Sequence, residues 1–136
     1  MVDWAAEVRY STCMKKVYNE LVRDRMIDIY KRDVAEGIFA SDYSVHYLEP
    51  KETLELLKDE LLEESKEVFE AYGKEDKAEL KEEFADMIEV VDAILHHNDI
   101  ELEGVLQIRD EKKVKKGGSE EGLFLEYIEY VDGQEK

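Results

Sequence analysis

Residues 50–97, PKETLELLKDELLEESKEVFEAYGKEDKAELKEEFADMIEVVDAILHH, decide the fold of this chain. Their apolar residues recur at the three- and four-residue spacing of amphipathic helices, and a glycine interrupts the pattern. This spacing predicts one helix over 51–72, with Pro50 in front of it and Gly73 as its C-cap. A second helix is predicted over 76–97. Because the connection is only a few residues long, the two helices should pair antiparallel as a hairpin.

Weaker signals on both sides of this hairpin predict flanking helices. One helix is expected from about 24 to 36, and another should cover 101–116 and end at Gly117. Asp99 is a candidate N-cap for the latter helix. The segment 123–131, LFLEYIEYV, is a candidate for a short C-terminal strand. The expected fold class is therefore all-α, a helical bundle built around the antiparallel hairpin.

The composition narrows the classes of partner. The 136 residues include 36 acidic and 19 basic side chains, which give a net charge of -17. Such a field repels phosphate backbones and anionic lipids, so neither a nucleic-acid polymer nor a membrane is an expected partner. The chain has one cysteine, Cys13, and no apolar run near the length of a membrane span. Together with the lack of a signal-peptide pattern, these features favour a cytoplasmic protein.

Two acidic residues of the first hairpin helix stand where apolar residues are expected. At about 100° per residue, Glu64 falls between Leu57 and Ala71, inside the apolar stripe, and Glu67 lies on the edge of this stripe. Other acids of the same helix, such as Glu70, point away from it. Glu64 and Glu67 therefore form a pair spaced i, i+3 on the side that faces the partner helix.

The second hairpin helix repeats this anomaly. Glu83 falls between Val90 and Ile94, inside its apolar stripe, and Asp86 lies beside Val90 at the edge. The stripe itself should be centred near Phe84 and Val91. In a chain this acidic, either pair alone could be a solvated surface, but two pairs on core-facing positions of consecutive helices point to a site.

An antiparallel hairpin would bring these four carboxylates into one partly desolvated groove. Their mutual repulsion and burial would destabilise the fold, and a multivalent cation would offset both. Mg²⁺ prefers carboxylate oxygens and shares its coordination with substrate phosphates. The sequence thus predicts a metal site for Mg²⁺, or for Mn²⁺, with Glu64, Glu67, Glu83 and Asp86 as ligands.

This ExxE…ExxD arrangement resembles the signature of MazG-type nucleotide pyrophosphohydrolases. Two further segments resemble the subgroup akin to phosphoribosyl-ATP pyrophosphohydrolase: 18–26, YNELVRDRM, and 109–124, RDEKKVKKGGSEEGLF. The chain departs from the subgroup in three places. Glu20 stands where a lysine is usual, no proline follows Met26, and Ser119-Glu120-Glu121-Gly122 lengthens the link between the glycine pair and the phenylalanine, Phe124.

The resemblance also bears on the domain organisation. Met14 aligns with the usual start of the family, so residues 1–13 would be an N-terminal extension and residues 14–136 a single MazG-like domain. Members of the family are usually dimers or tetramers whose paired helices form a bundle. The resemblance therefore implies a homodimer or homotetramer.

The activity that the resemblance implies is hydrolysis of a nucleoside triphosphate to the monophosphate and pyrophosphate, in the clearing of damaged or surplus nucleotides. The ions would bridge the triphosphate oxygens, and a water held by metal or carboxylate would attack the α-phosphorus. Glu64 and its neighbour Glu63 are both candidates for the general base, and the helical wheel favours Glu64 because Glu63 points outward.

The basic residues offer candidate phosphate contacts. Lys113 and Lys116 belong to the only dense basic run, which could equally serve as favourable charge at a helix C-terminus. Arg23 and its neighbour Asp24 could form a structural ion pair or approach the phosphates from a neighbouring subunit. These alternatives stay open on sequence alone.

Two rival functions also remain. One is phosphoribosyl-ATP pyrophosphohydrolase proper, acting in histidine synthesis. The other is a non-catalytic acidic helical module that binds a basic protein, which would explain the charge and the helices. This module would not explain acids inside two apolar stripes, and divalent-dependent release of pyrophosphate from a nucleotide would separate it from an enzyme.

Overall fold

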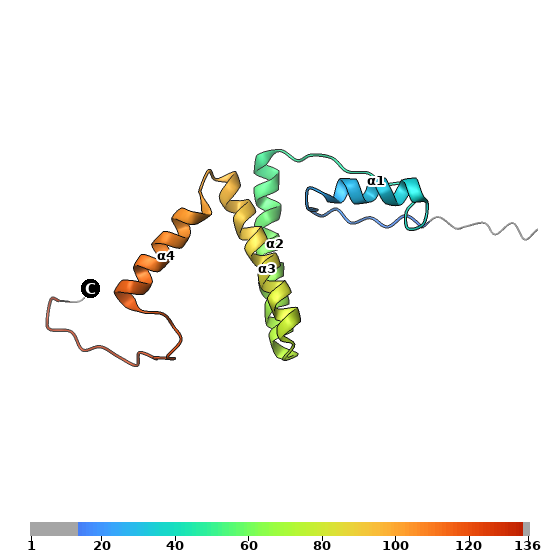
Figure 1. The fold of residues 1–136 in the computed structure, drawn as a ribbon. Helices are drawn as coiled ribbons and strands as arrows, with labels where there is room; N and C mark the ends of the chain where they lie inside the picture. Colours follow the sequence, from blue (N-terminus) through green and yellow to red (C-terminus); the bar gives the residue numbers. More distant parts are fainter. Residues whose placement is uncertain (1–13, 135–136) are drawn as a thin grey trace, which may run out of the picture.

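The computed structural model describes residues 14–134, which form four α-helices and no strand (Figure 1). The helices are α1 (Met26–Glu36), α2 (Pro50–Gly73), α3 (Lys77–His97) and α4 (Leu102–Lys116). The protein is thus all-α, as predicted, and each long helix begins and ends within about two residues of the expected bounds. No helix of the described range is long and apolar enough to cross a membrane.

Individual residues at the ends of α2 and α3 determine where these two helices begin and end. Pro50 occupies the first turn of α2, where its missing N–H leaves no hydrogen bond unmade. Gly73 remains helical, so the expectation that it caps α2 was wrong: Lys74 caps the helix instead, in right-handed backbone geometry that needs no glycine. The Asp76 carboxylate then begins α3 by accepting hydrogen bonds from the N–H groups of Ala78 and Glu79.

The two hairpin helices run antiparallel (Figure 1). Within residues 14–134, extensive packing between helices occurs between these two. On α2, the side chains of Leu57, Val68 and Ala71 are buried. On α3, Met87 and Ile94 are half-buried. The core therefore lies along one seam of the hairpin.

The apolar stripe of α3 is only partly used by this seam. The sequence placed its centre near Phe84 and Val91. Val91 is half-buried, but Phe84 is 44% exposed and Ile88 is 58% exposed. The half-buried positions Leu80, Met87 and Ile94 lie to one side of that centre. A helical wheel gives the direction of the whole apolar face, whereas contact with α2 covers only part of it.

The flanking helices extend away from the hairpin on opposite sides (Figure 1). Gly37 caps α1 with φ 64°, a left-handed conformation that glycine adopts without steric cost. Glu101 precedes α4 without a side-chain cap, so the prediction of Asp99 as N-cap was wrong. As predicted, α4 ends at Gly117, with φ 80°.

The candidate C-terminal strand at 123–131 is not formed in the described chain. A strand needs hydrogen bonds from a neighbouring strand, and this segment has no such neighbour within residues 14–134. Its apolar side chains are exposed, with Leu123 at 97%, Phe124 at 85% and Tyr127 at 75%. The predicted N-terminal extension, 1–13, lies outside the described residues.

Candidate metal and catalytic site

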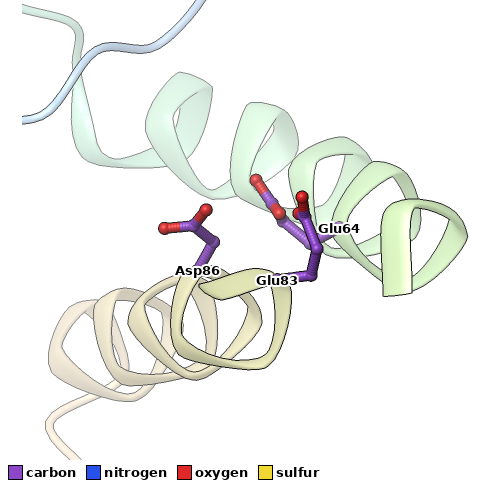
Figure 2. A group of neighbouring side chains, drawn as sticks. All are labelled: Glu64, Glu83 and Asp86. Carbon is purple, nitrogen blue, oxygen red and sulfur yellow. The ribbon is translucent and has the colours of Figure 1, made fainter. Parts of the chain in front are cut away.

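Three carboxylates, those of Glu64, Glu83 and Asp86, meet between α2 and α3 (Figure 2), and we call the place where they meet the groove. Glu64 comes from α2, whereas Glu83 and Asp86 come from α3. One oxygen of each carboxylate lies within 4.8 Å of an oxygen of the other two. The two acid pairs predicted a convergence of four carboxylates, and three of the four, all but Glu67, meet here.

Helical geometry explains how each side chain reaches this groove. Glu64 lies seven residues, close to two turns, from both Leu57 and Ala71, which are buried against α3. It therefore points into the same seam as these two residues. Glu83 and Asp86 are three residues apart, which places them one above the other on one face of α3.

Of the three acids, Glu64 is the one with a buried carboxylate oxygen that lacks a hydrogen-bond partner within residues 14–134. Its Oε2 atom is buried and has no hydrogen-bond partner among the described residues. Burial is the largest cause that raises the pKa of Glu64, and repulsion from Glu67, Asp86 and Glu83 raises it further. A buried, unpartnered carboxylate oxygen is costly, and such an atom in a native structure calls for a ligand or another explanation.

Glu67 lies at the open edge of the same groove. Its side chain is exposed, and it stands next to Glu83 rather than within the group of three. The pKa of Glu83 is raised by desolvation, then by a hydrogen bond and repulsion from Glu67. The fourth predicted acid therefore adjoins the cluster through Glu83.

Glu60 lies on the same side of α2 as Glu64 and is an acidic residue that the predicted site did not include. Burial raises its pKa, and repulsion from Glu20, Glu63 and Glu67 adds to the effect. The signal was present in the sequence, since Glu60 is four residues before Glu64 and so lies on the same face of α2. The contribution of Glu20, forty residues earlier, had no periodic signal.

Other predicted residues lie elsewhere. Glu63 is exposed, on a part of α2 that faces away from the seam. Lys113 and Lys116 are on α4, which extends away from the hairpin, and Lys113 donates a hydrogen bond to Glu120. The described chain does not bring these two lysines to the carboxylates.

Arg23 does reach the groove. Its Nη2 donates to Oδ1 of Asp86 at 2.5 Å, across 63 residues of sequence. The ion pair that the sequence suggested for Arg23 thus forms with Asp86 and not with the neighbouring Asp24. Both side chains of the pair remain accessible, with 63% and 44% of their surfaces exposed.

The three carboxylates fit a hard divalent cation. They offer only oxygen donors, which Mg²⁺ and Mn²⁺ prefer, and all three side chains are only half-buried, so waters and substrate phosphates could complete the coordination. The unpartnered Oε2 of Glu64 is an oxygen that such an ion would satisfy. Enzymes of the kind that the sequence resembles typically use divalent metals, so the chemistry of the donor set agrees with that expectation.

The family model for phosphoribosyl-ATP pyrophosphohydrolase matches residues 39–113. A search of curated proteins and a search of solved structures each found no match. The matched range contains the whole hairpin and all three converging carboxylates, and it spans more than half of the 136 residues. The chain therefore belongs to the phosphoribosyl-ATP pyrophosphohydrolase family, whose members are hydrolases of phosphoric anhydride bonds.

Proposed function

We propose that this pyrophosphohydrolase cleaves a nucleoside triphosphate to the monophosphate and pyrophosphate at the groove between α2 and α3. The observation that carries the proposal is the convergence of Glu64, Glu83 and Asp86 from two helices, with one oxygen of each within 4.8 Å of the others. An acidic groove cannot by itself attract a polyphosphate. It can do so once a divalent cation has reversed its local charge.

In this proposal Glu64, Glu83 and Asp86 hold Mg²⁺ or Mn²⁺, and Glu67 completes the set from the edge of the groove. When bound, the metal neutralises the charge that develops on the phosphate oxygens during cleavage. The antiparallel hairpin fixes the positions of the ligands. Because they project from two rigid helices rather than from loops, little reorganisation is needed at the moment of reaction.

Glu64 is the better candidate to orient the attacking water. Its carboxylate lies inside the groove, and one oxygen has no partner there. A general base must lie within hydrogen-bond reach of the water that it activates. Glu63 is exposed on another face of α2, which supports Glu64 in this role.

The basic residues Arg23, Lys113 and Lys116 are the proposed phosphate contacts. Arg23 is the one of the three that already adjoins the carboxylates, through Asp86. The two lysines are on α4, apart from the hairpin of their own chain (Figure 1). They would act on this groove only after α4 moves or from a second copy of the chain.

A second copy is expected on separate grounds. Large apolar side chains of the hairpin are exposed in the single chain: Leu62 at 71%, Phe69 at 75%, Tyr72 at 72%, Phe84 at 44% and Ile88 at 58%. On α2, Leu62 is two residues from Glu64 and so points about 160° away from it. We propose that this face pairs hairpins into a homodimer or homotetramer and leaves the acidic side open.

Two substrates fit the family equally well. One is a damaged or surplus nucleoside triphosphate, and the other is phosphoribosyl-ATP, the substrate for which the family model is named. Both contain the anhydride bond that the proposed site would cleave.

Pyrophosphate release should therefore be measured with Mg²⁺ over a panel of canonical nucleotides, modified nucleotides and phosphoribosyl-ATP. Preference for the last would assign the chain to histidine synthesis, whereas preference for a free nucleotide would support the clearing role. Release that is absent from every substrate, with and without Mg²⁺ or Mn²⁺, would refute the proposed activity and favour the non-catalytic acidic module.

A further inference from the structure

The segment that precedes α1 comes near the acidic residues of the hairpin at Glu20 and Arg23. Glu20 is close enough to Glu60 to raise the pKa of that carboxyl, second only to burial among the causes. Three residues later, the Arg23 guanidinium bonds to Asp86. This segment therefore brings a repulsive charge, Glu20, near α2 and an attractive charge, Arg23, into contact with α3.

Arg23 adds a positive charge to a group of negative side chains. Among residues 14–134, it is the cation that forms an ion pair with the group of Glu64, Glu83 and Asp86. Its positive charge stands beside three carboxylates that repel one another. A divalent cation in the groove would supply the same neutralisation with twice the charge and closer contact.

We propose that Arg23 is a resident counter-ion of the metal-free groove, and that the metal displaces it from Asp86. The inference rests on the proposed metal site and adds a competition to it. The Asp86 carboxylate has two oxygens, so geometry alone would let it meet both cations. The charges decide against this, because a guanidinium and a divalent ion on one carboxylate repel each other strongly.

The exposure of the ion pair indicates which cation is displaced. Arg23 is 63% exposed and Asp86 is 44% exposed, and ion pairs this accessible contribute little to stability. The metal, in contrast, gains oxygen ligands from three side chains at once. Metal binding should thus release Arg23 together with the adjoining segment 19–25, and leave a free guanidinium at the rim, where substrate phosphates would lie.

The test is calorimetric titration of the full chain with Mg²⁺ alone, without nucleotide. Removing Arg23 removes the competitor, so Arg23→Ala should bind Mg²⁺ about fivefold more tightly, the equivalent of an exposed ion pair of about 1 kcal/mol. Arg23→Lys keeps the charge and should stay near the wild type. Arg109→Ala is the matched control, since Arg109 is also an exposed arginine paired with an aspartate, and its loss changes the net charge equally.

Amide hydrogen exchange supplies a second readout. With saturating Mg²⁺, exchange in residues 19–25 of the wild type should become faster, while α1 of the same chain stays unchanged. Arg23→Ala binding Mg²⁺ with unchanged or weaker affinity would overturn the inference, and weaker binding would show that Arg23 orients Asp86 for the metal instead. A wild type that binds no Mg²⁺ or Mn²⁺ at all would refute the proposed metal site itself, and this competition with it.

Discussion

Four glutamates of the hairpin provide an internal control for the site. Glu64 and Glu83 point into the groove, whereas Glu70 and Glu89 are exposed on other faces of the same two helices. Replacing each in turn by glutamine removes one negative charge and keeps the shape of the side chain. Net charge and helix propensity therefore change alike in all four variants, and only the position differs.

The expected effect on activity follows from the role of the carboxylate. A lost ligand removes stabilisation of charge in the transition state, so Glu64→Gln and Glu83→Gln should each lower kcat by roughly 100-fold or more. Glu70→Gln and Glu89→Gln should remain within about twofold of the wild type, because isolated surface charges contribute little.

The effect on metal-free stability should have the opposite sign. Two unit charges 4.8 Å apart repel by about 3.5 kcal/mol at an effective dielectric constant near 20 and by about 0.9 kcal/mol in water. Because the groove is open to solvent on one side, the smaller value is the better guide. Glu64→Gln should therefore raise the free energy of unfolding by about 1 kcal/mol, or the melting temperature by about 3 to 5 °C.

Two measurements check this reasoning on the same preparations. Pyrophosphate release at saturating Mg²⁺ gives the activity, and thermal unfolding in chelator gives the metal-free stability. Variants at 64 and 83 should be less active, and the Glu64 variant more stable, than those at 70 and 89. If all four variants behaved alike in both assays, the assignment of the groove as the active site would be wrong.

Three further predictions concern the intact protein. Mg²⁺ or Mn²⁺ should raise the melting temperature of the wild type, since a ligand specific to the native state stabilises it, and Glu83→Gln should shrink this shift; a wild-type melting curve unmoved by metal would contradict the site. Light scattering should give a dimer or larger at micromolar concentration and a smaller species for Ile88→Glu, whereas a wild-type monomer would refute the oligomer. Because burial raises the folded-state pKa of Glu64 above its ordinary 4.5, protonated Glu64 should stabilise the metal-free protein fully below pH 4.5, and this stability should be lost as the pH rises through the raised pKa. The loss should be smaller in Glu64→Gln, and an equal loss in chelator would contradict the assignment.

The hairpin could be predicted from the sequence because its signals are local. The apolar spacing, the proline at 50 and the short connection near Asp76 together specify two helices and their antiparallel pairing. The same periodicity located Glu64, Glu83 and Asp86, since a side chain on a regular helix is placed by its number alone. The convergence of these three is thus the part of the site that the sequence predicted best.

Long-range contacts could not be obtained in this way. Arg23 meets Asp86 across 63 residues, through an irregular segment whose path has no period. Of the two residues predicted at the centre of the apolar stripe on α3, Val91 is half-buried but Phe84 is exposed, for a related reason. A helical wheel treats all apolar residues alike. It does not separate those buried towards α2, such as Met87, from those that stay exposed in the single chain, such as Phe84.

The difference between buried and exposed apolar residues also explains why the two sides of this hairpin differ. One apolar seam is used within the chain, a second apolar face on Phe69 and Phe84 stays exposed, and the acids lie on the opposite side of the seam from that face. If the exposed face pairs with another hairpin, the acids stay at the surface of the bundle, open to metal and phosphate. Burying them in the bundle would forbid entry, and spreading them over the surface would leave too few ligands together. The violation of the apolar pattern at Glu64 and Glu83 therefore marks the position where ligand access and ligand convergence can both be met.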